Sequence, residues 1–244
     1  MPPEGDTNPG AGIRLVAGGD VMLGEHPLTV GWGLGTRLRR VGAPYPFAHL
    51  RELMAGADLA VANLECSLAD RPRGAPYDAC QCLGPAAGVA SLVAAGFHTV
   101  SVANNHVLQH GPDVFRATLA ALRRAGVEPV GEAAGAAAEP DAGHLRCRPV
   151  DREAGGVPLR LLAYSLRPRQ HFTEPPLYAE PTAASLLADV RAGHAAGRTV
   201  VVSLHWGDEF VARPSPAQVA LGRRLVDEGA TLVLGHHPHV LQGW

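Results

Sequence analysis

The chain has 244 residues and a formal net charge of −2 at pH 7, and all 21 of its basic side chains are arginines. Because it contains no lysine, this chain cannot hold a P-loop, a Schiff-base enzyme site or a protein-kinase site, each of which needs a lysine amine. The near-neutral charge argues against a nucleic-acid surface, and a chain of this length can bury the core of one ordinary domain.

Short apolar runs alternate with amphipathic stretches along the chain. They predict strands at 13–17, 58–62, 99–103, 127–130, 159–163, 199–204 and 231–234, and helices at 46–56, 85–96, 112–125, 186–196 and 215–228. This alternation is typical of an α/β architecture with a largely parallel or mixed sheet. No internal repeat or linker interrupts it, so we predict a single domain. Residues 133–141 and 165–181 are predicted loops, and the length of the second is typical of a lid or a substrate-contacting element.

The ends of the chain and its cysteines bear on its environment. Residues 1–12 are rich in proline and glycine, which predicts a disordered leader. The chain shows no signal peptide and no run of 18 apolar residues, so we expect a cytoplasmic protein with no membrane partner. Cys66, Cys80, Cys82 and Cys147 lack the spacing of a zinc site and are expected to be mostly reduced, with a bridge such as Cys80–Cys147 left open.

Polar side chains follow five of the predicted strands. The loops at the carboxyl ends of strands in α/β folds converge on one crevice, so these side chains are expected to meet. Their carboxylate, amide and imidazole groups suit a hard or borderline divalent ion. The set contains more than four potential ligands, which is compatible with two ions that share a bridging carboxylate. The residues concerned are Asp20, Asn63, Glu65, Asn104, Asn105, His106, His205, Asp208, Glu209, His236, His237 and His239.

Each of these groups alone has a structural explanation. Asp20 can serve as a turn residue, Glu65 as a solvated charge and His205 as a core histidine. The imidazoles at 236, 237 and 239 are the hardest to explain in this way, because a strand end gains nothing from three of them. All these polar groups lie at equivalent positions after strands, and this coincidence favours a functional site over separate structural roles. Whether His110 and His171 belong to the site is left open.

The motifs occur in one order along nearly the whole chain. They are GDVMLG at 19–24, NLE at 63–65, ANNH at 103–106, SLHWG at 203–207 and GHHPHV at 235–240. Together they resemble the poly-γ-glutamate capsule-synthesis (CapA) family, which looks like a branch of the calcineurin-like metallophosphoesterases. The resemblance implies an αββα four-layer sandwich over residues 13–244. It also implies two divalent ions (manganese, zinc or iron) at one edge of the two sheets.

The resemblance also implies roles for individual residues. His106 would be the catalytic residue that contacts the leaving group. The implied metal ligands are Asp20 and His239 for a first ion, Asn105, His205 and His237 for a second, and Glu65 as the bridge. The residues expected to orient these ligands or to contact substrate are Asn104, Asp208, Glu209, His236 and Arg213. Arginines near these positions, such as Arg167, Arg169 and Arg213, can grip phosphate or carboxylate groups.

Three features depart from the family pattern. Met22 stands where the phosphoesterases have a histidine, so the first metal site would be weaker or more open unless Glu25 or His26 reaches it. The chain lacks the N-terminal anchor of membrane-associated relatives, which counts against a role in a membrane polymer synthase. It also ends before the strands that usually follow in the family.

We therefore expect a metal-dependent hydrolase that most readily acts on a phosphoester, with metal-bound hydroxide as the nucleophile. The substrate would be a small molecule, a peptide or a polymer. Three alternatives stay open: an enzyme that makes, transfers or cleaves poly-γ-glutamate or γ-glutamyl amides, a di-iron redox enzyme, and a non-catalytic accessory protein that binds an anionic polymer. The sequence does not indicate the oligomeric state.

Overall fold

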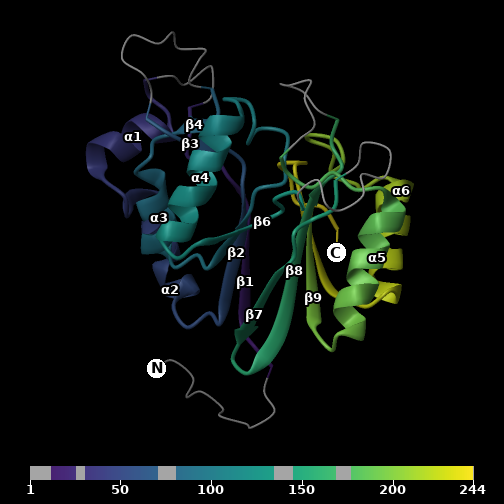
Figure 1. Ribbon diagram of the computed structural model, residues 1–244. Helices are drawn as coiled ribbons and strands as arrows, with labels where there is room; N and C mark the ends of the chain where they lie inside the picture. The colour runs from purple at the N-terminus through teal and green to yellow at the C-terminus, as the bar shows by residue number, and fades with distance from the viewer. Residues whose placement is uncertain (1–11, 26–30, 71–80, 135–144, 169–176, 244) are drawn as a thin grey trace.

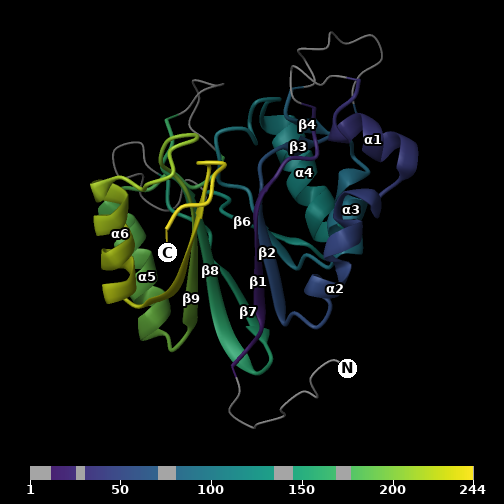
Figure 2. The ribbon, with the colours of Figure 1, turned by 180° about the vertical axis from the view of Figure 1, so that it is seen from behind.

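The computed structural model describes residues 12–25, 31–70, 81–134, 145–168 and 177–243. Two four-stranded sheets pack face to face between two layers of helices (Figure 1). The same four layers are visible from behind (Figure 2). This arrangement confirms the predicted αββα sandwich.

The two sheets differ in the direction of one edge strand. The first sheet is parallel throughout, in the order β1-β2-β5-β6, with β1 at Leu15–Val21, β2 at Leu59–Leu64, β5 at Thr99–Ser101 and β6 at Glu128–Val130. The second has the order β10-β9-β8-β7, with β7 at Val150–Ala154, β8 at Val157–Ser165, β9 at Thr199–His205 and β10 at Ala230–His236. Only β7 is antiparallel to its neighbour. Parallel strands bring their carboxyl ends to one edge, where both sheets deliver polar residues.

The helices cover the outer faces of the sheets. On the side of the first sheet lie α1 at Leu34–Val41, η2 at Tyr45–Leu50, α2 at Arg51–Met54, α3 at Gly88–Ala95 and α4 at Pro112–Arg124. On the side of the second lie α5 at Ala183–Ala195 and α6 at Pro216–Asp227. A short pair, β3 at Ser67–Leu68 and β4 at Leu83–Gly84, joins the first half.

Local sequence explains where the helices begin and what they bury. Helix α4 begins at Pro112, whose missing N–H costs nothing in a first turn, and buries Phe115, Leu119 and Leu122 on one stripe. Helix α6 begins with a capping box in which the side chains of Ser215 and Gln218 each accept the other residue's backbone N–H. These signals are local, and both helices were predicted from the sequence.

The core lies between the two sheets and under the helices. Every residue of β2 is buried, as expected for a central strand. Val61 and Val130 from the first sheet and Leu161 and Val201 from the second line one narrow space between the sheets. The two sheets therefore share one hydrophobic core.

Several strands run further than predicted. Strand β1 continues to Val21, so Asp20 lies inside the strand and not after it. The register shifts between Ala17 and Asp20, because Gly18 and Gly19 form a bulge there. Strands β9 and β10 likewise continue to the first histidine of each motif, because the parallel ladder between them extends to that position.

Two further predictions differ from the structure, and four elements of the structure were not predicted. The predicted helix at 46–56 is a 3₁₀ turn followed by a single turn of α-helix, with non-helical dihedrals at Phe47. Elements α1, β3, β4 and β7 were not predicted. The predicted loop at 165–181 is partly core, because Tyr178 and Ala179 are fully buried and bridge to the segment after β6.

Some predictions concern residues outside the described ranges. These are the leader at 1–11, most of the loop at 133–141, and the side chains of His26, Cys80, Arg169 and His171. Cys66, Cys82 and Cys147 are buried free thiols, which agrees with the expected reduced state for those three. None of the helices in the described ranges is both long and apolar enough to cross a membrane.

Candidate metal centre

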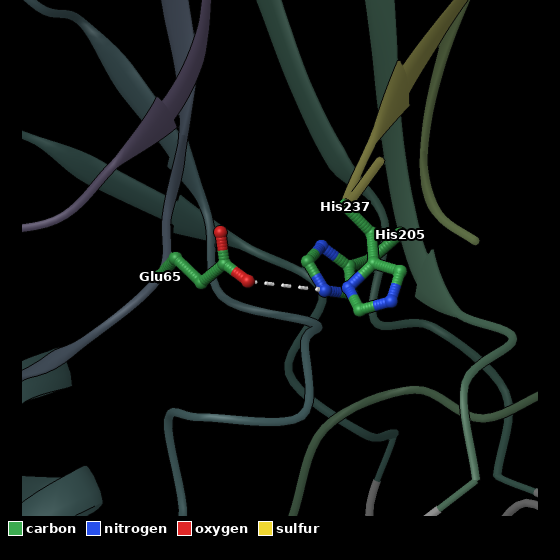
Figure 3. Close-up of side chains that lie close together, drawn as sticks. All are labelled: Glu65, His205 and His237. Atoms are coloured by element: carbon green, nitrogen blue, oxygen red, sulfur yellow. Dashed lines mark ion pairs between the residues drawn. The ribbon is translucent and has the colours of Figure 1, made fainter. Parts of the chain in front are cut away.

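Glu65 and two histidines from the other sheet form the buried centre of the site. Glu65 follows β2, and His205 is the last residue of β9. The Nε2 atom of His205 lies 3.4 Å from Glu65 Oε1 and 2.8 Å from Asn105 Oδ1. In Figure 3 the Glu65 carboxylate points across toward the rings of His205 and His237, which come from the second sheet. All four side chains are buried.

The turn after β10 presents two more imidazoles. His237 and His239 have φ angles of 94° and 53°, which non-glycine residues adopt only where surrounding contacts impose them. His239 Nδ1 lies 3.1 Å from Asp20 Oδ2, and its Nε2 lies 3.9 Å from Glu65 Oε1. The strained turn therefore aims both rings at the carboxylates of the first sheet.

These side chains form three overlapping groups whose ligand atoms lie within 4.8 Å of one another. The groups are Asp20, Glu65 and His239; Glu65, His205 and His237; and Glu209, His237 and His239. Glu65, His237 and His239 each belong to two of these groups, and Glu65 is the shared carboxylate.

Three buried side chains in the cluster have ring or carboxylate atoms without a hydrogen-bond partner. Among the described residues these atoms are both ring nitrogens of His237, Glu65 Oε1 and His236 Nδ1. A buried polar atom without a partner is costly and rare. A divalent cation held by oxygen and imidazole ligands would satisfy His237 and Glu65, so the residues present fit such an ion.

A hydrogen-bond network holds Asp20 in place. Asp20 Oδ1 accepts a hydrogen bond from Asn63 Nδ2 (2.8 Å), and Oδ2 accepts one from the backbone N–H of His237 (3.0 Å). Asn63 is fully buried, and its Nδ2 also lies 3.3 Å from His205 Nδ1. The sequence places Asn63 among the polar residues expected to meet at the strand ends, but it assigns Asn63 no role of its own. Its position between the two sheets could only be seen in three dimensions.

Asn104 shapes the loop that carries Asn105 and His106. Its Nδ2 donates to Asn63 Oδ1 (3.1 Å) and to the backbone carbonyl of Leu64 (2.9 Å). Its Oδ1 accepts the backbone N–H groups of His106 and Val107. All of these partners are internal, so Asn104 positions the loop and Asn63.

The remaining predicted residues lie around the cluster. His106 is half-buried, with Nδ1 3.0 Å from Gln109 Oε1. His236 is buried, with Nδ1 3.5 Å from Asp20 Oδ1. Arg167 Nη1 donates to the Gly207 carbonyl and to Asp208 Oδ1 (3.1 Å), which ties an arginine to the loop after β9.

Three residues that the sequence left open or proposed do not join the cluster. Glu25 accepts a hydrogen bond from Thr36 and faces α1, so it does not replace the histidine missing at position 22. His110 Nε2 lies 2.7 Å from the Gln81 carbonyl. Arg213 is exposed and forms no hydrogen bond or ion pair within the described ranges.

The electrostatics of the cluster are those of a crowded, buried site. Burial, followed by the charge of Asp20, raises the pKa of Glu65 to about 9. Burial, followed by the charge of Arg167, lowers the pKa of His237 to about 4, and burial places the pKa of His205 well below its ordinary value. Burial acts to raise the pKa of Asp20, but hydrogen bonds from His236 and Asn63 outweigh it and hold that pKa below its usual range. Neutral imidazoles are the form that binds metal ions.

The fold and the cluster define an α/β sandwich of the metallophosphoesterase-like class. A family model described as bacterial capsule synthesis protein PGA_cap matches residues 14–244, so the chain belongs to this CapA-like family. The family resemblance that the motifs carry is thereby confirmed.

Two curated relatives have similar sequences. A capsule biosynthesis protein CapA of Bacillus anthracis is 28% identical over 246 residues, covering 95% of this chain and 56% of the relative. A probable polyglutamine synthesis accessory protein of Mycobacterium tuberculosis is 34% identical over 194 residues, covering 75% of this chain and 50% of the relative. The chain thus spans about half the length of these relatives.

Proposed function

We propose that this protein is a metal-dependent hydrolase that cleaves a phosphoester. The residues that would hold its divalent ions are Asp20, Glu65, Asn105, His205, His237 and His239. The observation that carries the proposal is the overlap of the ligand groups at Glu65, beside an imidazole, His237, whose two ring nitrogens have no other partner in the described structure. A structural histidine would hydrogen-bond to the core, as His98 does by accepting the Ala60 N–H. Ions bound there would supply Lewis acidity and activate water for in-line attack at phosphorus.

The protein's own residues provide position and proton transfer. Asp20 is fixed by Asn63 and by the His237 N–H, so its carboxylate is already oriented. The 3.0 Å contact between His106 Nδ1 and Gln109 Oε1 holds the imidazole ring in place, and the protonated ring would give a proton to the leaving oxygen. The guanidinium of Arg167, close enough to lower the pKa of His237, can bind a phosphate oxygen with its remaining N–H groups.

The direct test is metal content and turnover of an aryl phosphate in matched variants. His237→Ala should lose bound metal and activity together, whereas His49→Ala, an exposed histidine of η2, should keep both. Asp20→Ala should behave like His237→Ala. An active, metal-loaded His237→Ala protein would contradict the proposal.

The names of the relatives favour a second candidate. One of them is named an accessory protein of polyglutamine synthesis, which favours a non-catalytic role for this chain in making such a polymer. In that role the ions would stabilise the cluster without turnover. A fully metal-loaded protein that binds poly-γ-glutamate but cleaves no member of a broad phosphate and peptide panel would establish this candidate over the hydrolase.

A further inference from the structure

Phe210 is an exposed aromatic residue held in an unusual backbone conformation beside the cluster. It follows Glu209 in the loop after β9, its φ angle is 60°, and the residue is 70% exposed. A bulky residue with positive φ is strained unless contacts impose the conformation, and such strain concentrates at functional sites. Here the Phe210 N–H donates to the Pro238 carbonyl (2.8 Å), which locks the loop onto the histidine turn.

The Phe210 ring borders the metal ligands directly. Its centroid lies 6.1 Å from that of His239, at an interplanar angle of 46°. The preceding residue, Glu209, shares a ligand group with His237 and His239. The Phe210 ring therefore lies beside the cluster.

Two more exposed apolar residues lie in the same two loops. Val211 is 46% exposed and Val240 is 37% exposed, and Gln242 Nε2 donates to the Val211 carbonyl (2.8 Å), which holds the two loops together. We call Phe210, Val211 and Val240 the Phe210 rim. An exposed aromatic group of this kind gains free energy only when an apolar ligand covers it.

We propose that Phe210, with Val211 and Val240, binds an apolar leaving group or ester substituent of the substrate. The inference rests on the proposed hydrolase for the reacting phosphate, which the ions and Arg167 would hold. It adds that the substrate is amphiphilic: an anionic head at the metal centre and an alkyl or aryl portion against the Phe210 rim. A uniformly charged substrate would leave this rim uncovered.

The experiment is a chain-length series of methyl, butyl and hexyl phosphate with the metal-loaded full chain. On a half-covered surface, kcat/KM should rise about twofold per added methylene, so hexyl should exceed methyl phosphate about thirtyfold. Phenyl phosphate distinguishes an aryl from an alkyl preference. The Kd values of the matching alkylphosphonates, measured by calorimetry, give the same series without turnover.

Variants separate the effect of the ring from that of the strained backbone. Phe210→Ala removes the ring and keeps the strain, Phe210→Gly removes both, and Phe210→Trp keeps an aromatic surface. The first two should lower the ratio of hexyl to methyl phosphate to about threefold or less, and the third should keep the wild-type ratio. Trp32→Ala removes an exposed aromatic near α1 and should leave the series unchanged.

The outcomes distinguish this inference from the proposed function. Turnover of every phosphate at equal efficiency would overturn the apolar rim and leave the hydrolase standing. Absence of turnover with a preserved chain-length dependence of phosphonate binding would overturn the hydrolase and support the rim. Flat phosphonate binding in the wild type would overturn the rim in either case.

Discussion

Replacing Glu65 with glutamine should remove most of the pH dependence of stability that the metal-free protein shows above pH 7. Burial raises the pKa of Glu65 to about 9, against an ordinary value of 4.5. Between these values the folded protein keeps a proton that the unfolded chain has lost. The free energy of unfolding therefore falls by about 1.4 kcal/mol per pH unit in that window. This stabilisation is complete below pH 4.5 and is lost as the pH rises through 9.

The assay is urea unfolding of chelator-treated protein at pH 7.0 and 8.5. Burial keeps the pKa values of His205 and His237 low, so both rings are neutral in the folded state at these pH values and largely neutral in the unfolded state. The wild type should lose about 2 kcal/mol over this interval, and Glu65→Gln, which mimics the protonated carboxyl, should lose little. Glu52→Gln, at an exposed glutamate of α2, should keep the wild-type slope. Equal slopes in the wild type and Glu65→Gln would refute the raised pKa.

The proton that Glu65 keeps in the metal-free protein should be released into solution when metal binds. A ligand carboxylate must be deprotonated, so adding zinc or manganese at pH 7.5 should release about one proton from Glu65. Calorimetry in two buffers of different ionisation enthalpy measures this number. Glu65→Gln should release none from this position.

Four further substitutions test the network and the fold. Asn63→Ala should weaken metal affinity about 10- to 100-fold, measured by competition with a fluorescent chelator, because Asp20 loses its donor; unchanged affinity would argue against that role. His237→Gly should leave the melting temperature of the metal-free protein unchanged or raise it, because the φ angle of 94° at this position suits glycine. The same variant should lose the increase in melting temperature that metal causes, and an increase that persists would exclude His237 as a ligand. Gly131→Ala should cost at least about 2 kcal/mol in urea unfolding, since its Cβ would lie 2.8 Å from Ala103 Cβ at a φ of 101°. Ser215→Ala should cost about 1 kcal/mol by the same measurement, and no loss would mean that the cap of α6 is dispensable.

Much of the fold could be predicted from periodicity and local stop signals. Helices such as α4 and α6 carry their own start signals, and their predicted limits hold within one or two residues. Four elements, α1, β3, β4 and β7, were not predicted. Strand β7 reads as charged and polar because it is an edge strand with alternate residues in solvent, and α1 follows a glycine-rich stretch with no capping side chain.

The residues of the site could be predicted because topology alone brings strand ends together. Six proposed ligands from five segments lie in one cluster, although their roles as ligands stay predictions. The sequence could not show the hydrogen-bond network that holds these side chains in place. The contacts of Asn63 with Asp20 and His205 span 43 and 142 residues of sequence, and nothing local to Asn63 indicates either partner.

The placement of the cluster would tie the proposed metal binding to the packing of the two sheets against each other. Asp20, Glu65 and Asn105 come from the first half of the sandwich, and the three histidines come from the second. Neither half holds all six proposed ligands, and the buried side chain of Asn63 contacts both halves. An ion that binds only the assembled sandwich stabilises it by an amount that grows with the logarithm of ion concentration over Kd. Metal should therefore stabilise the whole sandwich and not only its loops. Because Glu65 must lose its proton first, that stabilisation should be largest at alkaline pH, where the metal-free protein is weakest.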